Sequence, residues 1–238
     1  MNIILFERDE IDRPLGLDDG RAVHVLQVIG CKEGDSFDIG IVDGPRGKAR
    51  VEAIGKRGLM LDFNFFSGIP HLSPVVMIIG LPRPPSARRI LKDLTSQGVA
   101  QLHFVATDKG EKSYLNSRLW TGDEYQRLLR EGAEQAFCTR MPEVVLHESL
   151  TACLDELAEG SDRLALDNYE ATMPIGQYRV EREHCVLAVG SERGWSAAER
   201  QALRSRDFAL VGLGERVLKT ETACIAGLAL VLAKLKVY

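Results

Sequence analysis

The chain lacks the features that mark disulfide-stabilised and common metal-binding proteins. Its 238 residues include five cysteines, and no two of them form a Cys-x-x-Cys pair. An odd number of widely spaced cysteines is typical of reduced thiols, so we expect neither a disulfide framework nor a zinc site. The five histidines form no His-Glu-x-x-His pattern. The sequence therefore predicts no bound metal.

Export and membrane signals are also missing. The first residues, Met1 to Glu7, contain no basic region followed by a long apolar run, so we expect no signal peptide. The longest apolar stretch, near the C-terminus, is too short and too interrupted to span a bilayer. These absences predict a cytoplasmic protein with no membrane partner.

Positive charge is not in excess over the whole chain. The formal net charge is −4, which argues against a surface that is cationic throughout. Residues 83–140 carry ten Lys and Arg against seven Asp and Glu, whereas residues 1–68 carry nine against twelve. Any RNA-facing surface is therefore expected to be local, and an ordinary solvated surface remains the alternative.

The first part of the chain reads as β-rich. Turn signals separate four short strand-like runs, and a short helix is expected over residues 18–28. Strands at this spacing predict a small β-barrel. Residues 67–74 hold two prolines and a glycine, which is typical of a linker. The expected strands are Ile3 to Glu7, Ser36 to Val42, Ala49 to Ile54 and Leu59 to Phe65. We thus divide the chain into a barrel over residues 1–66, a linker over 67–74 and a second domain over 75–238.

The second domain alternates strands and helices, which predicts a parallel sheet covered by helices on both faces. The expected strands are Val75 to Leu81, Leu102 to Ala106, Leu164 to Leu166, Cys185 to Val189 and Phe208 to Leu213. The expected helices are Ser86 to Gln97, Thr121 to Phe137, one that starts with a Ser196–Glu199 capping box, and Ala223 to Lys236. The last helix is apolar nearly all round, so we expect it in the core or at a subunit interface.

Two glycine-marked loops join strands to helices in this domain. Glycine lets the backbone approach a small ligand closely, so Gly190, Gly194 and Gly214 are candidate binding positions. Tight turns without a ligand are the alternative. A dinucleotide fingerprint is poorly matched, because its third glycine position holds Val217. No Gly-Lys-Ser/Thr occurs, which excludes a P-loop.

Both loops follow a recognisable pattern. The first reads Val189-Gly190-Ser191-Glu192-Arg193-Gly194-Trp195-Ser196 with Glu199, and the second reads Leu213-Gly214-Glu215-Arg216-Val217-Leu218-Lys219-Thr220-Glu221-Thr222-Ala223. A third run, Glu131-Gly132-Ala133-Glu134-Gln135, precedes Arg140-Met141-Pro142-Glu143. In order and spacing these motifs resemble the RsmE family of the SPOUT superfamily, enzymes that methylate a uridine at ring nitrogen 3 in small-subunit (16S) ribosomal RNA. The resemblance covers nearly the whole chain.

The resemblance implies a fold and its partners. It implies a PUA-like small β-barrel that binds RNA, followed by a SPOUT α/β domain with a deep trefoil knot. It also implies S-adenosylmethionine as the cofactor, ribosomal RNA or the small ribosomal subunit as the partner, and a homodimer. The strand pattern alone would instead predict an open, unknotted sheet.

The resemblance also assigns residues to roles. Arg140, which would hold phosphate or offset charge on the uracil, and Glu221 are the catalytic candidates. The RNA-binding candidates are Arg21, His24, Arg83, Arg88, Arg89, Lys109 and Arg140. The cofactor-binding candidates are Leu166, Asp167, Val189, Gly190, Ser191, Glu192, Gly194, Leu213, Gly214, Val217, Leu218, Thr220, Thr222 and Ala223. Arg140 as a plain surface arginine is the alternative.

The acidic and hydroxyl side chains of the loops have competing duties. Glu192 and Glu221 would face the sulfonium or the methionine amine of the cofactor, or else pair with Arg216 or a helix N-terminus. Thr220 or Thr222 is also expected to cap the last helix.

The chain departs from the family pattern mainly at RNA-facing positions. Arg21 and His24 are reshuffled, Cys138 replaces a basic residue, and Ser191 and Arg193 replace a proline and a glycine of the first loop. Two alternatives therefore stay open. One is a cofactor-binding module that associates with RNA or the ribosome without this activity, and the other is an RNA methyltransferase with a different target.

Overall fold

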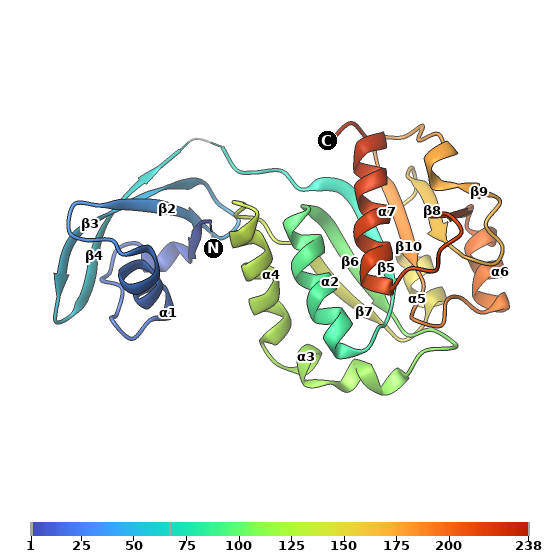
Figure 1. Cartoon of the computed structure of the whole chain (residues 1–238), viewed down its shortest axis with the longest axis horizontal. Coiled ribbons are helices and arrows are strands. Elements are labelled where there is room, and N and C mark those ends of the chain that lie inside the picture. The colour runs from blue at the N-terminus through green and yellow to red at the C-terminus, as the bar shows by residue number, and fades with distance from the viewer. Residues whose placement is uncertain (1, 67, 238) are drawn as a thin grey trace. The chain divides into compact units, whose positions relative to one another are not determined.

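The computed structural model describes residues 2–66 and 68–237, which fold into two compact units (Figure 1). One unit comprises residues 1–71 together with residues 133–141, and the other comprises residues 72–132 and 142–238. The segment 133–141 thus joins the first unit although it lies far from that unit in the sequence. Within the described residues, no helix is long and apolar enough to cross a membrane.

The first unit is a four-stranded sheet in the order β1-β2-β3-β4. The first pair is parallel and the other two pairs are antiparallel. The strands are β1 (Ile4–Phe6), β2 (Ser36–Ile41), β3 (Arg46–Gly55) and β4 (Gly58–Phe65). The sheet curls around a short helical segment, and its inner side chains, which include Phe6, Ile39 and Leu59, form one buried cluster. This agrees with a barrel-like unit.

The expected helix over residues 18–28 is present in two parts. The α-helix α1 (Gly20–Val23) continues directly into a π-helical turn, η2 (His24–Ile29). Asp19 caps the start, since its carboxylate accepts a hydrogen bond from the backbone N–H of Arg21 at 2.8 Å. A 3-10 turn, η1 (Arg8–Glu10), precedes this segment.

The second unit is built on a seven-stranded sheet in the order β7-β6-β5-β10-β8-β11-β9, and every pair of neighbouring strands in it is parallel. The expected α/β fold with a parallel sheet is therefore confirmed. Central strands are buried on both faces, which explains their continuous apolar sequences. The strands are β5 (Ser73–Gly80), β6 (Val99–Val105), β7 (Glu143–His147), β8 (Asp162–Leu166), β9 (Met173–Pro174), β10 (Cys185–Val189) and β11 (Ala209–Gly212).

Helices cover both faces of this sheet. Helices α2 (Pro84–Ser96) and α7 (Thr220–Lys234) pack together on one face, whereas α5 (Leu150–Glu156) and α6 (Ala197–Ser205) pack on the other (Figure 1). Beside α2 lies α4 (Glu124–Gln135), which follows the single turn α3 (Arg118–Thr121). Two 3-10 turns, η3 (Lys112–Asn116) and η4 (Ile175–Gln177), complete the unit.

Several helix ends differ from the expectation. Helix α2 starts at Pro84 with Arg83 as its N-cap, because the fixed φ of proline suits the first helical position; Ser86 is not the cap. Helix α7 starts at Thr220 with Lys219 as its N-cap, so neither threonine caps it. The Ser196–Glu199 capping box is confirmed. The structure also contains β7 and α5, which the sequence analysis did not predict.

Candidate active site

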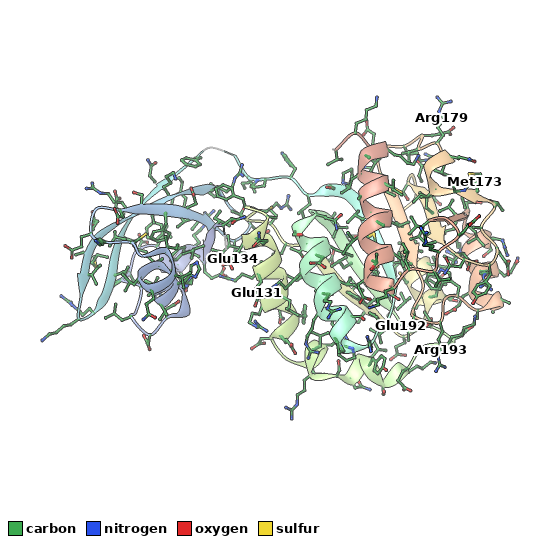
Figure 2. All side chains as sticks on the ribbon, in the orientation of Figure 1. Glu131, Glu134, Met173, Arg179, Glu192 and Arg193 are labelled. Atoms are coloured by element: carbon green, nitrogen blue, oxygen red, sulfur yellow. The ribbon has the colours of Figure 1, made fainter. Side chains whose placement is uncertain are left out.

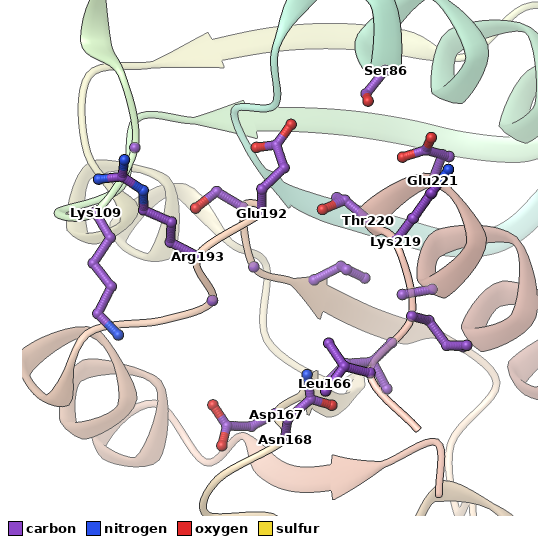
Figure 3. Close-up of a pocket in the computed structure, with 18 of the residues that line it drawn as sticks. Ser86, Lys109, Leu166, Asp167, Asn168, Glu192, Arg193, Lys219, Thr220 and Glu221 are labelled. Carbon is purple, nitrogen blue, oxygen red and sulfur yellow. The ribbon is translucent and has the colours of Figure 1, made fainter. Parts of the chain in front are cut away.

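A pocket of about 700 Å³ lies at the edge of the second unit where the carboxyl ends of the parallel strands meet (Figure 3). Ligands of open α/β sheets commonly bind at this edge. Loops that follow β5, β6, β8, β10 and β11 supply the walls. The lining residues are Arg83, Ser86, Lys109, Gly110, Glu111, Tyr114, Leu166, Asp167, Asn168, Tyr169, Val189, Gly190, Ser191, Glu192, Arg193, Gly194, Leu213, Arg216, Val217, Leu218, Lys219, Thr220, Glu221 and Ala223.

The first glycine loop packs tightly against the end of β5. A Cβ on Gly80 would lie 2.3 Å from the backbone nitrogen of Ser191, so only glycine fits there. The hydroxyl of Ser191 accepts a hydrogen bond from Thr107 Oγ1 at 3.1 Å, and Glu192 Oε1 accepts one from the backbone N–H of Arg83 at 3.0 Å. The loop is thereby held against the ends of both β5 and β6.

Trp195 and Lys109 fix the far end of this loop. The indole of Trp195 is fully buried, and its Nε1–H donates to the carbonyl oxygen of Leu166 at 3.1 Å. The ammonium of Lys109 donates to the carbonyl oxygen of Trp195 at 2.9 Å. This one loop therefore contacts the ends of three strands. These contacts keep the backbone groups that line the pocket in fixed positions.

A buried ion pair shapes the loop after β8. The carboxylate of Asp167 accepts hydrogen bonds from the backbone N–H groups of Tyr169 and Glu170, and its Oδ2 lies 2.7 Å from Arg200 Nε. The Arg200 guanidinium also lies over the Tyr169 ring, 5.2 Å from its centroid. Asp167 and Arg200 are both almost fully buried, so each charge depends on the other for stabilisation.

The second glycine loop leads into α7. Gly214 has φ +109°, a left-handed backbone conformation that favours glycine. At the start of the helix, Glu221 Oε1 lies 3.4 Å from Arg89. A hydrogen bond from its own backbone N–H lowers the pKa of Glu221, and the Ser86 hydroxyl and Arg89 lower it further, while burial opposes the shift. Glu221 is therefore ionised at neutral pH.

The structure brings most of the cofactor candidates together. All of them line the pocket except Gly214 and Thr222. Figure 3 shows Lys109 and Arg193 on one side of the pocket and Lys219 and Glu221 on the other. The proximity of the cofactor candidates agrees with the prediction, and the binding roles of these residues remain predictions.

The RNA-binding candidates are more dispersed. Arg83 and Lys109 line the pocket. On α2, Arg88 pairs with Glu124 and Arg89 with Glu221. The remaining three belong to the first unit: Arg21 is held by Glu10 and Asp19, His24 opens the π-helical turn, and Arg140 Nε lies 3.9 Å from Asp43.

The pocket also contains residues that the sequence analysis did not assign to a site. Asn168 and Tyr169 follow Asp167 directly, and Gly110, Glu111 and Tyr114 follow Lys109. Their place in strand-end loops was the available signal. Arg193 had been noted only as a departure from the family pattern. It is a surface residue next to Glu192, as Figure 2 shows.

Three pocket arginines have no ion-pair partner in the part of the chain that the structure describes. They are Arg83, Arg193 and Arg216. Unpaired guanidinium groups are strong donors for phosphate oxygens, because their planar fork matches the geometry of the anion. The pocket wall therefore combines glycine-rich backbone, apolar side chains and free positive charge.

Comparison with known proteins places this arrangement in a family. A family model described as an RNA methyltransferase domain matches residues 70–232. Ribosomal RNA small subunit methyltransferase E of Treponema pallidum is 35% identical over 98% of this chain and 91% of its own length. Ribosomal RNA small subunit methyltransferase E 1 of Borreliella burgdorferi is 30% identical over 99% of both chains.

Solved structures show the same fold. One is a ribosomal RNA small subunit methyltransferase E from Neisseria gonorrhoeae bound to S-adenosyl methionine, with a TM-score of 0.78 and 19% identity, covering 98% of this chain and 97% of its own. Another is a probable rRNA-methyltransferase from Porphyromonas gingivalis, with a TM-score of 0.80 and 20% identity over 99% of both chains. With its glycine-loop pocket and these relatives along nearly its whole length, the chain belongs to the ribosomal RNA small subunit methyltransferase E (RsmE) family of RNA methyltransferases.

Proposed function

We propose that this protein transfers a methyl group from S-adenosylmethionine to ring nitrogen 3 of a uridine in small-subunit (16S) ribosomal RNA. Family membership supports methylation of ribosomal RNA, since two relatives at 30% identity or more carry that activity in their names. The observation that carries the proposal to this chain is the pocket between the two glycine loops. Its volume of about 700 Å³ falls within the range of roughly 300–1,000 Å³ that is usual for small-molecule sites.

The pocket residues fit S-adenosylmethionine. Backbone groups of the glycine loops are available to the adenine edge, which carries both hydrogen-bond donors and acceptors. Side chains of Leu166, Val189, Leu213 and Leu218 supply apolar walls. When bound, the cofactor would supply a methyl group on a positively charged sulfonium. The ionised carboxylate of Glu221 stabilises positive charge in the pocket.

The target nitrogen requires help of a different kind. Uridine nitrogen 3 is a weakly acidic imide, so it must lose its proton before it attacks a methyl group. No histidine occurs among the residues that line the pocket. Cationic side chains such as Lys109 and Arg193 instead stabilise the uridine anion and lower the barrier to deprotonation. Holding the anion in line with the methyl group contributes several kcal/mol through positioning alone.

Positive charge also suits the RNA backbone. We assign phosphate contacts to Arg83 and Arg216, two pocket arginines without ion-pair partners among the described residues. Each phosphate contact releases counterions, so RNA binding should weaken steeply as salt rises. Arg140 is proposed to contact phosphate or the uracil from the first unit of the chain.

Further features of the proposal follow the family resemblance. We propose that the first unit is a PUA-like barrel that binds RNA, that residues 75–238 contain a deep trefoil knot, and that the protein acts as a cytoplasmic homodimer. The apolar helix α7 supports the dimer. Its side chains Ile225 and Leu230 remain 36% and 39% exposed, although much of the helix is buried.

Nucleoside mass spectrometry on ribosomal RNA tests the proposal. We expect 3-methyluridine to disappear from cells without the gene and to return with the wild-type gene. It should not return with Gly190→Val, since a Cβ there would lie 3.0 Å from the Cα of Gly194. An unchanged nucleoside profile, with cofactor binding retained in vitro, would favour an RNA- or ribosome-associated module without this activity. Loss of a different methylated nucleoside would indicate another target.

A further inference from the structure

Three metal-ligating side chains meet in the interior of the second unit, outside the pocket. They are His103 on β6, His147 on β7 and Cys153 on α5, and their ligand atoms all lie within 4.8 Å of one another. Each of the three residues is more than nine-tenths buried. The mechanism proposed above uses none of them, and none lines the pocket.

The hydrogen bonds around His103 determine its protonation. Gln101 Nε2 donates to the carboxylate of Glu143 at 2.9 Å, which fixes the orientation of the Gln101 amide. The amide oxygen of Gln101 therefore faces His103 Nε2, at 3.5 Å. An acceptor in this position favours the tautomer with the proton on Nε2. His103 Nδ1 is left as a lone pair that points into the cluster.

His147 faces the cluster with its other ring nitrogen. Its Nδ1 lies 3.9 Å from the carboxylate of Glu156, and its Nε2 lies 2.8 Å from His103 Nδ1. In the metal-free protein, a hydrogen bond from His147 Nε2–H to His103 Nδ1 accounts for this distance. A metal ion between the two nitrogens would replace that hydrogen bond.

We propose that His103, His147 and Cys153 bind a zinc ion. Two imidazole nitrogens and one thiolate are donors that zinc prefers, with a fourth position left for water. The acceptors on the outer nitrogens match the arrangement in which a ligating histidine donates its other N–H to an oxygen. The distant sequence positions, on two strands and a helix, explain why no zinc motif was visible.

Cys153 would bind zinc as a thiolate, because coordination deprotonates a thiol outright. The residue is fully buried and lies beside the two histidines.

For the two histidines, zinc binding requires only a small adjustment. Nitrogen ligands about 2.0–2.1 Å from a tetrahedral zinc lie about 3.4 Å apart, so the two rings must separate by about 0.6 Å. Strand β7 is the outermost strand on one side of the sheet. A zinc ion at this point would fasten it to β6 and to α5 at once.

Zinc analysis of the full-length protein, purified without chelator and after tag removal, tests the proposal. We expect stoichiometric zinc by plasma mass spectrometry and a lower thermal midpoint after chelation. Replacement with Co²⁺ should give the visible bands of a tetrahedral site and a thiolate-to-cobalt absorption in the near ultraviolet. Protein that stays free of zinc, and that shows no change in thermal midpoint with added Zn²⁺, would overturn the proposal and leave a direct hydrogen bond between the two histidines.

Variants separate coordination from general packing. Cys153→Ala and His147→Asn should abolish zinc binding, whereas Cys185→Ala, at an equally buried cysteine outside the cluster, should retain it. Gln101→Leu should weaken zinc affinity roughly 10–100-fold, as expected for loss of an outer hydrogen bond. Zinc retained by Cys153→Ala would overturn the site. If a cluster variant fails to fold, the cobalt spectrum of the wild-type protein still decides.

Discussion

Gly214 is constrained by its backbone. A Cβ there would meet no protein atom within 4 Å, so the protein itself leaves room for a side chain. Its φ of +109° is the constraint that the structure shows, because L-amino acids rarely adopt it.

We therefore expect Gly214→Ala to cost about 1–3 kcal/mol of backbone strain. This cost should appear as weaker S-adenosylmethionine binding, lower stability or both, because the loop must either stay strained or relax away from the pocket. Calorimetry and urea unfolding measure the two. Gly176→Ala is the matched control, since Gly176 has open space and no positive φ. Wild-type affinity together with wild-type stability in Gly214→Ala would contradict the argument.

Glu221 gives a prediction about pH. Its pKa is lowered from the ordinary value of 4.5, first by its own backbone N–H and then by Ser86 and Arg89. A carboxyl group with a depressed pKa in the folded state stabilises the protein above its unfolded pKa, and that contribution is lost as pH falls through the folded value. Urea unfolding between about pH 6 and pH 3 should show this loss in the wild-type protein but not in Glu221→Gln. Glu215→Gln, at an exposed glutamate, is the control. If the stability of Glu221→Gln depends on pH in the same way as that of the wild type, the prediction is refuted.

The loop after β8 depends on one buried ion pair. We expect Arg200→Met to destabilise the protein by about 3–5 kcal/mol, since it leaves the Asp167 carboxylate buried without its partner. The loop that contributes Asp167, Asn168 and Tyr169 to the pocket should loosen, so cofactor affinity should fall as well.

Arg204→Met is the control for this element. Arg204 lies on the same helix as Arg200 and pairs with Glu170. Each side chain of that pair is 40% exposed, so the pair should contribute little to stability. Urea unfolding and calorimetry compare the two variants. Equal, small effects from both would show that the buried pair does not hold the loop.

The elements themselves were largely readable from the sequence, because their signals are local. Continuous apolar runs gave the central strands, and the Ser196–Glu199 box gave the start of α6. Helix starts that lack a side-chain cap were missed. Pro84 starts α2 and Thr220 starts α7, and in both helices the preceding residue caps without a side-chain hydrogen bond.

Contacts between distant segments were not readable. The pairing of Asp167 with Arg200 joins residues 33 positions apart, and the two histidines of the proposed zinc site lie 44 apart. No period or motif links such positions, because the sheet order brings them together. The glycine loops were found because each motif lies within about ten consecutive residues. The free cation Arg193 became a site candidate only when the structure placed it on the pocket wall.

At the scale of the whole molecule, the proposed machinery is divided between the two units. Every residue that lines the pocket belongs to the second unit, whereas Arg140 belongs to the first. The proposed homodimer contains two copies of Arg140, one on each chain. We predict that the partner's copy acts in catalysis.

Two single variants and their mixture test this prediction. Arg140→Ala should reduce turnover while cofactor affinity stays nearly unchanged, because Arg140 does not line the pocket. Gly190→Val should lose cofactor binding, because the valine side chain would lie too close to Gly194. Chains of the two kinds, unfolded together and refolded as mixed dimers, should recover part of the wild-type activity. Only the mixed dimer pairs an intact pocket with an intact Arg140 from the other chain. Mixtures as inactive as the separate variants would mean that Arg140 serves its own chain, and a monomer mass in light scattering at all concentrations would remove the dimer altogether.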